Sequence, residues 1–433
     1  MWFARILSAA FALAMAGAAV AQEPTGRGAI FFHPDGSSAA HWDVARMLYA
    51  GPDGTLNWDR YPYLAPYRGH LADQLVSTSN GGAVSHATGT RAHARSFGMD
   101  PAGNEMVSAD GTNLTIVEAA VEAGIPTALI QSGSLIEPGT AAFVAEAERR
   151  GHYERIALQV VESGVDIHFG GGEQWMLPEG VEGRFGPGRR SDGRNLIEEL
   201  EDAGYAVVHT RDELIAMPDD VTRVFGVFAE GHTFFDASEE ELAEAGRPHF
   251  LASAPTIAEM TAFALDRLTD DPRGFLFVIE EEGSDNFCNK LNAAGCLEAL
   301  KRADDAAGYL LDFVENHPDT LLVTAADSSA AGMNVLNVPE GMSRVPARNP
   351  NVGGLMDGRE GTSSAPFVSA PDAQGRSFPF AIVWNTSADV GGGVVARGAG
   401  WNADRFLDPS GVHNIDIYAM LYETLFGEPP SAD

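Results

Sequence analysis

Short apolar runs alternate with amphipathic stretches along most of the 433-residue chain. The apolar runs predict buried strands, because each is short and continuous. They cover residues 29–32, 128–130, 275–279, 320–324 and 380–384. The amphipathic stretches have the periodicity of helices, as in residues 115–123, 156–163, 195–203 and 256–268. This alternation predicts an α/β fold with a doubly wound, mostly parallel central sheet flanked by helices on both faces.

Carboxylates follow four of the predicted strands, at the edge where a parallel sheet gathers its functional residues. They are Asp35 after the first strand, Glu280, Glu281, Glu282 and Asp285 after the third, Asp327 after the fourth and Asp389 after the fifth. A single acid after a strand is more often a helix N-cap or a turn residue than a ligand. Four such groups on one edge would repel one another severely unless cations lay between them. The pattern therefore predicts a polynuclear metal site with oxygen ligands, suited to a phosphate or a similar oxyanion.

Residues 77–89 form a second candidate segment. The hydroxyl side chains of Ser77, Thr78 and Ser79 precede Gly81 and Gly82, which predicts a tight turn leading into a helix of small residues. Backbone N–H groups at such a helix start attract an anion. Turns rich in Ser and Gly are common, so the segment alone is a weak signal. Beside the carboxylates, it predicts a hydroxyl nucleophile next to a metal cluster.

Composition and charge limit the classes of partner. Hydrophobic residues make up 45% of the chain, which is ordinary for a globular protein with a large core. With 28 basic and 61 acidic residues, the formal net charge is −33. A field of this sign repels phosphate backbones and anionic lipid, so we expect neither nucleic acid nor membrane as a partner.

The first 21 residues have the pattern of a secretory signal peptide. An apolar run from Ile6 to Val20 ends in small residues that are typical of a cleavage site. The run is short of the roughly 20 residues that a membrane span needs, and an N-terminal anchor is the alternative. We expect a periplasmic or secreted protein with a single domain over residues 22–433. Export permits a disulfide, and Cys288 and Cys296 are compatible with a bridge or with two free thiols.

Several segments in this order resemble the alkaline phosphatase family. Residues 31–36 look like the opening strand of that family, which ends in Asp-Gly, and residues 76–100 align without gaps to its nucleophile segment. Residues 137–150 match a stretch that ends in an arginine, and residues 413–417 look like its closing Asn-x-Asp-Ile. The resemblance runs over essentially the whole chain after residue 22.

The resemblance implies a role for individual residues. Ser79 falls on the nucleophilic serine, with Thr78 in place of the preceding Asp, and Arg150 falls on the arginine that binds the substrate phosphate. The positions that match metal-site residues of the family are Asp35, Glu137, Glu280, Asp285, Asn289, Asp327, Ser328 and Asp389. Three of these, Asn289, Ser328 and Asp389, stand where the family has histidine, and Gly139 replaces a further metal-site residue. Oxygen side chains favour harder ions than imidazole does.

The implied function is an exported, metal-dependent phosphomonoester hydrolase that acts through a phosphoserine. Its cofactors would be divalent ions, zinc or magnesium, with calcium or manganese admitted by the oxygen-rich ligands. Its substrates would be small phosphate esters, and the resemblance also implies a homodimer. Two alternatives stand beside it: a phosphate- or metal-binding homologue with impaired catalysis, and a phosphodiesterase or sulfatase of the same superfamily.

Overall fold

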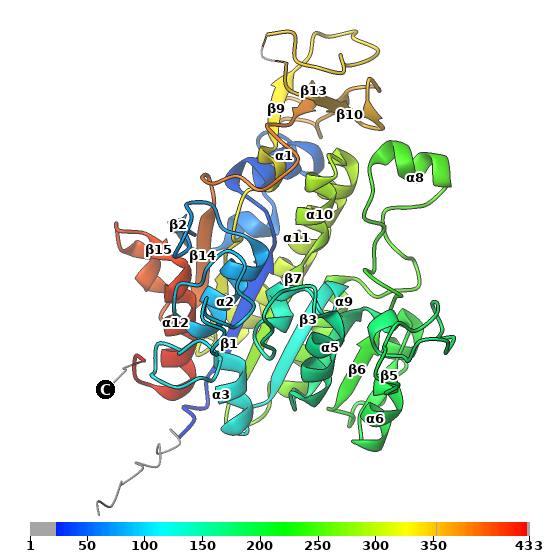
Figure 1. Cartoon of the computed structure of the whole chain (residues 1–433). Coiled ribbons are helices and arrows are strands. Elements are labelled where there is room, and N and C mark those ends of the chain that lie inside the picture. Colours follow the sequence, from blue (N-terminus) through cyan, green and yellow to red (C-terminus); the bar gives the residue numbers. More distant parts are fainter. Residues whose placement is uncertain (1–22, 352, 431–433) are drawn as a thin grey trace, which may run out of the picture.

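A ten-stranded sheet forms the centre of the protein (Figure 1). The computed structural model describes residues 23–351 and 353–430, so the predicted signal peptide lies outside the described residues. In spatial order, the strands are β15 (Val412–His413), β2 (Tyr63–Arg68), β14 (Val395–Gly400), β8 (Leu321–Thr324), β1 (Gly28–Pro34), β7 (Phe275–Glu281), β3 (Thr127–Ser134), β4 (Ile167–Gly171), β6 (Val224–Val227) and β5 (Ala206–Val208). Neighbouring strands from β8 to β5 are parallel, and β14 is antiparallel to both β8 and β2. The predicted mostly parallel sheet is confirmed.

Helices cover both faces of this sheet, as the alternation along the chain predicted. The side chains of β1 show why: Ile30 and Phe32 enter one apolar core, and Ala29 and Phe31 enter the other. The first core is closed by α1 (Ala39–Tyr49), α9 (Ile257–Leu268) and α11 (Ala293–Asn316). The second is closed by α2 (Ser79–Thr88), α3 (Ile116–Glu122), α5 (Tyr153–Glu162), α6 (Leu196–Asp202) and α12 (Asn414–Phe426). The remaining α-helices are α4 (Pro138–Ala141), α7 (Arg211–Ile215), α8 (Glu239–Ala245) and α10 (Gly283–Asn289).

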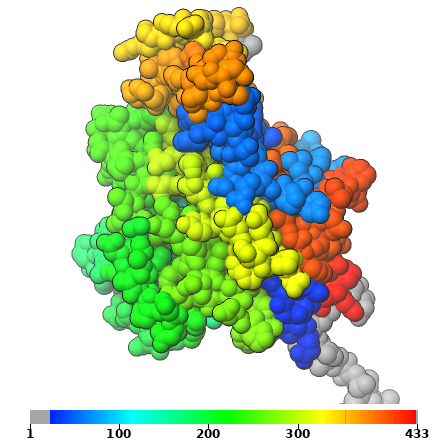
Figure 2. Space-filling model, turned by 180° about the vertical axis from the view of Figure 1, so that it is seen from behind, coloured from blue at the N-terminus to red at the C-terminus, as the bar shows by residue number. Residues whose placement is uncertain are grey.

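A second, five-stranded sheet lies at one end of the molecule (Figure 1; yellow and orange in Figure 2). Its antiparallel strands are β9 (Asn334–Asn337), β10 (Met356–Gly358), β11 (Gly361–Thr362), β12 (Phe367–Val368) and β13 (Pro379–Val383). The apolar run at residues 380–384 was expected in the central sheet, and that expectation is wrong. A five-residue apolar run is typical of a buried strand in any sheet, and its pairing partners decide which sheet it joins.

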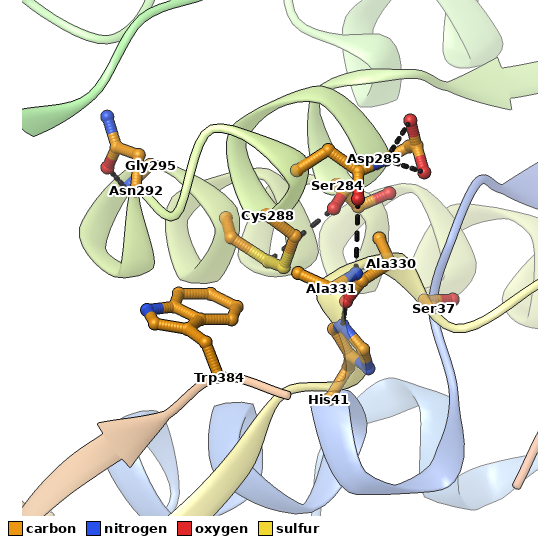
Figure 3. Close-up of a disulfide and its surroundings, with 12 residues drawn as sticks. Ser37, His41, Ser284, Asp285, Cys288, Asn292, Gly295, Ala330, Ala331 and Trp384 are labelled. Carbon is orange, nitrogen blue, oxygen red and sulfur yellow. Dashed lines mark hydrogen bonds between the residues drawn. A yellow bond between two sulfur atoms is a disulfide. The ribbon is translucent and has the colours of Figure 1, made fainter. Parts of the chain in front are cut away.

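Cys288 and Cys296 form a disulfide bond, which settles the choice that the sequence left open (Figure 3). The bond joins the last turn of α10 to the first turn of α11, and both cysteines are fully buried. It therefore braces the helix that carries Asp285 and Asn289. Among the described residues, no helix is long and apolar enough to cross a membrane.

Candidate active site

Three neighbouring parallel strands, β8, β1 and β7, bring the predicted carboxylates to one edge of the sheet. Asp35 directly follows β1, and Glu280 lies near the end of β7, where it is paired in register with His33. Asp327 follows β8 after two alanines. The sequence rule that polar residues gather at the carboxyl ends of parallel strands therefore holds for these acids.

The carboxylates are buried, and several of their oxygens have no protein partner. Asp35 and Glu280 are 0% exposed and Asp327 is 4% exposed. Atoms without a hydrogen-bond partner are Asp35 Oδ2, Glu280 Oε1, Glu282 Oε2, both Asp327 carboxylate oxygens and Ser328 Oγ. A buried carboxylate without a partner costs several kcal/mol by the usual desolvation estimate, roughly 2–7 kcal/mol even for a neutral polar group. A bound cation would satisfy these oxygens.

Burial and mutual repulsion raise the pKa of most carboxyl groups in this cluster. Burial raises the pKa of Glu280 to about 8, and burial with repulsion from Asp35 holds the pKa of Asp327 well above its ordinary value. Burial and repulsion from Asp389 also raise the pKa of Asp285 well above its ordinary value. Asp35 is the exception: burial opposes its ionisation, but His33 outweighs that effect and lowers its pKa to about 2. The protein alone does not neutralise so many carboxylates, which is the electrostatic signature of a cation site.

Asp35, Asp327 and Ser328 fit a hard divalent cation. Asp35 Oδ1 accepts a hydrogen bond from Gly36 N and lies 3.0 Å from His33 Nε2, which orients the carboxylate and leaves Oδ2 free. Both oxygens of Asp327 and the hydroxyl of Ser328 are also free. An all-oxygen donor set of this kind suits magnesium, calcium or manganese.

Asp285, Asn289 and Asp389 are brought together as well, but their chemistry differs. The Asn289 side-chain nitrogen lies 3.0 Å from both carboxylate oxygens of Asp285 and 3.0 Å from Asp389 Oδ1. Asn289 Oδ1 accepts a hydrogen bond from Ala331 N at 3.1 Å, which fixes the orientation of the amide. Asn289 therefore presents donors to the two acids, and its only ligating atom points away from them. This group fits a zinc ion poorly.

The start of α2 lies against Asp327. A Cβ atom on Gly82 would come within 2.8 Å of Asp327 Cβ, so the glycine permits this close approach. Thr78 is the N-cap: its Oγ1 accepts from Gly81 N and donates to Ala94 O. Ser79 is the first helical residue, it is half-buried, and its hydroxyl makes no hydrogen bond to the described residues. Of these two hydroxyls, that of Thr78 is engaged in hydrogen bonds and that of Ser79 is not, among the described residues.

Arg150 forms an ion pair with Glu137. Glu137 is the N-cap of α4, and the Arg150 side chain remains 39% exposed. Burial lowers the pKa of Arg150, but attraction to Glu137, and next to Glu282 and Asp285, outweighs burial and raises that pKa above its ordinary value. The predicted phosphate-binding arginine thus lies beside the carboxylate cluster, paired with a predicted metal ligand.

Three polar residues of this site were not among the predicted site residues. The sequence places Glu282 among the strand-end carboxylates, and it places His33 beside Asp35, where it could compensate for a missing metal-site histidine. Neither is assigned an individual ligand position, and Gln131 is not singled out. Gln131 Nε2 donates to Glu280 Oε2 at 2.6 Å and so holds that carboxylate in place. It lies on β3 next to β7. A signal was present, because Gln131 directly follows the apolar run at residues 128–130.

The chain is similar to known phosphatases. The family model described as alkaline phosphatase matches residues 27–347. The repressible alkaline phosphatase of Saccharomyces cerevisiae is 26% identical over 328 residues, which make up 70% of this chain and 55% of the yeast protein. The streptomycin-6-phosphate phosphatase of Streptomyces griseus is 27% identical over 346 residues, or 70% of this chain and 74% of that protein. The chain thus spans about half the length of the yeast relative.

Solved structures share the fold. The alkaline phosphatase of Thermus thermophilus superposes with a TM-score of 0.70 at 20% identity, covering 98% of each chain. A mutant alkaline phosphatase from the Antarctic bacterium TAB5, with magnesium bound in its M3 site, superposes with a TM-score of 0.67 at 17% identity. That match covers 93% of this chain and 98% of the other. At these identities the likeness establishes the architecture alone.

Proposed function

We propose a function from one premise: the chain belongs to the alkaline phosphatase family. Membership supports phosphoester hydrolysis in general. Within that class, we assign to this chain the metal-dependent hydrolysis of small phosphate monoesters through a phosphoserine at Ser79. One observation supports the assignment. Ser79, whose hydroxyl makes no hydrogen bond to the described residues, is the first residue of α2, and this helix packs against Asp327, whose carboxylate oxygens have no partner.

Ser79 would act as the nucleophile. Its Oγ would form a bond to phosphorus while the bond from phosphorus to the ester oxygen breaks, and the serine proton would end on the departing alcohol. Water would then replace Ser79 on phosphorus and release inorganic phosphate. The first turn of α2 supports this role, because its free backbone N–H groups favour negative charge near Ser79.

Arg150 would bind the phosphoryl oxygens. Its guanidinium has five N–H donors in a planar fork, and among the described residues Glu137 accepts from one of them. The remaining donors can hold two oxygens of a phosphate, which suits Arg and not Lys. Glu137 in turn fixes the side chain beside the carboxylate cluster.

Asp35, Asp327 and Ser328 would hold a divalent ion, which would supply positive charge to the transferring phosphoryl group. A chelated sample should therefore regain activity with magnesium, calcium or manganese, with zinc competing because of its high intrinsic affinity. Titration with each ion in turn, following both bound metal and hydrolysis, checks this preference. Reactivation by zinc alone would contradict the oxygen-ligand argument.

Export and substrate class complete the proposal. The leader-like residues 1–21 would direct the chain to the periplasm or the medium. A monoester substrate is supported by the Streptomyces griseus relative, whose name gives a phosphate monoester as its substrate. The net charge of −33 argues against nucleic acid, so the partners would be small esters and a second copy of the chain.

The test replaces Ser79. Ser79→Ala should reduce the turnover of an aryl phosphate by at least about 1,000-fold, because the attacking group is gone, while the fold and metal content stay unchanged. Acid-trapping of the phosphoenzyme and mapping of the label then locate the nucleophile. A label on Thr78, or no label, would contradict the assignment of Ser79 as the nucleophile.

A second candidate function is a phosphate- or metal-binding protein without turnover. The observation that favours it is the Asn289 amide, which satisfies two acids that would otherwise be available to a metal. The same experiment separates the two functions. A binding protein would bind metal and phosphate with no turnover in the native chain, and Ser79→Ala would then change nothing.

A further inference from the structure

His33 is a buried histidine whose ring is fixed from one side. Its side chain lies at the end of β1 and is 2% exposed. Nδ1 lies 2.7 Å from the backbone oxygen of Ala325. A carbonyl oxygen can only accept, so Nδ1 carries the hydrogen, and Nε2 has a lone pair in the neutral ring. Ligating histidines in metalloproteins are commonly oriented by such a bond from the other ring nitrogen.

The Nε2 atom faces two carboxylates at distances that suit ligands of one ion. It lies 3.0 Å from Asp35 Oδ1 and 3.9 Å from Glu280 Oε1, and the three ligand atoms lie within 4.8 Å of one another. Two ligands that are each about 2.1 Å from an ion lie about 3.0 Å apart at a right angle and about 4.2 Å apart when opposite. Both observed distances fall in this range.

The Glu280 carboxylate is held with one oxygen free. Gln131 Nε2 donates to Oε2, and Oε1 has no hydrogen-bond partner although the residue is fully buried. Gly139 makes room for it: a Cβ atom at that position would lie 1.7 Å from Glu280 Oε1. Any other residue at 139 would displace the carboxylate from its present place.

A protonated His33 paired with Asp35 is the simpler reading, but it leaves the cluster unsatisfied. The proton on Nε2 would serve Asp35 Oδ1 at 3.0 Å, while Glu280 Oε1 at 3.9 Å lies beyond hydrogen-bond reach. Glu280 Oε1, Asp35 Oδ2 and Glu282 Oε2 would still lack a partner. A cation with two charges and several open coordination positions satisfies more of these oxygens than one proton does.

We propose that His33 Nε2, Asp35 and Glu280 Oε1 bind one divalent transition-metal ion. The imidazole nitrogen distinguishes this group from the all-oxygen set of Asp35, Asp327 and Ser328. One nitrogen beside two carboxylates favours manganese, zinc or a similar ion over magnesium and calcium. His33 thus provides a ligand on the side of the site where Gly139 has no side chain. The inference rests on the metal dependence proposed above, but not on turnover.

The test detects the nitrogen ligand directly. The metal-free full chain is saturated with Mn²⁺, and pulsed electron paramagnetic resonance is used to look for coupling of the ion to an imidazole nitrogen. We expect the coupling in the native chain and its loss in His33→Gln, whose affinity at one site should fall at least about tenfold. His168→Gln is the matched control, because His168 is also 2% exposed but its ring contacts Ser163 and Phe225.

A second variant perturbs the proposed metal site without replacing any of its ligands. Gly139→Ala should displace Glu280 and weaken the same Mn²⁺ site, with folding checked by circular dichroism. Coupling that persists in His33→Gln, or bound Mn²⁺ without nitrogen coupling in the native chain, would overturn the proposal. Mn²⁺ binding of native strength in Gly139→Ala would overturn the place of Glu280 in it. None of these readings depends on phosphatase activity, so the two proposals can fail separately.

Discussion

Two groups of acids in the same carboxylate cluster differ in how their oxygens are satisfied. Asp35, Glu280 and Asp327 lie at the ends of β1, β7 and β8, and each has at least one buried oxygen without a partner. Asp285 and Asp389 share the Asn289 amide, whose nitrogen lies 3.0 Å from each of them. The first group has unused acceptors, and the second has largely used them within the protein.

The difference shows that residue type alone does not identify a ligand. All of these side chains offer oxygen and lie in one electrostatic cluster, because Asp35 raises the pKa of Asp285 and Asp327 by repulsion in addition to burial. An amide that donates to two carboxylates takes the place of a cation between them. We therefore expect the strand-end group to carry metal and phosphate chemistry and the Asn289 group to act mainly as scaffold.

Replacing one acid of each group tests this comparison most strongly. Asp35→Asn should lower both metal content and the catalytic efficiency kcat/KM by at least about 100-fold, because a fully buried charged ligand is lost. Asp389→Asn is the matched control, and we expect it to cost about tenfold or less. Metal analysis after dialysis and steady-state kinetics measure both effects. Equal losses in the two variants would abolish the distinction.

Removal of the disulfide next to Asn289 should have an effect of intermediate size, on the free energy of unfolding. Cys288 and Cys296 are eight positions apart, and closing so short a loop is worth about 2.5 kcal/mol in the loop-entropy estimate. Cys296→Ser should therefore lower the free energy of unfolding by about this amount in urea titrations. The metal content of the strand-end group should stay unchanged, because the bond braces α10 and not β1 or β7.

Two comparisons control this measurement. Ala299→Ser places a hydroxyl on the same buried helix without breaking the bond. Reduction of the native chain should reproduce the loss seen in Cys296→Ser. If reduction does not lower the free energy of unfolding of the native chain, the bond contributes nothing to the stability of the fold.

The strand-end group could be predicted from sequence, because its signal is local. Asp35, Glu280 and Asp327 follow or end apolar runs that are typical of buried strands, and β1, β7 and β8 are parallel neighbours in the central sheet. The place of β13 could not be predicted, because its pairing with β9, β10 and β12 depends on partners and not on its own residues.

The role of Asn289 could not be predicted from the sequence either. An asparagine near acids can offer either its oxygen or its nitrogen, and the choice depends on the backbone N–H of Ala331, 42 positions away. His33 illustrates the same limit, since the tautomer that frees Nε2 is set by Ala325 on the neighbouring chain segment. Contacts between distant segments decide which atom of a polar side chain is free.

The smallest expected effect applies the same distinction to two adjacent hydroxyls. Thr78 uses its hydroxyl as a helix cap and as a donor to Ala94 O, whereas Ser79 makes no such bond. Thr78→Ala should cost about 1 kcal/mol of unfolding free energy and change turnover by less than about threefold. Thr115→Ala is the matched control, because Thr115 caps α3 and donates to the backbone oxygen of Phe143 in the same way. Urea unfolding and aryl phosphate kinetics on both variants give the answer: a loss of turnover in Thr78→Ala alone would make Thr78, and not Ser79, the reactive hydroxyl.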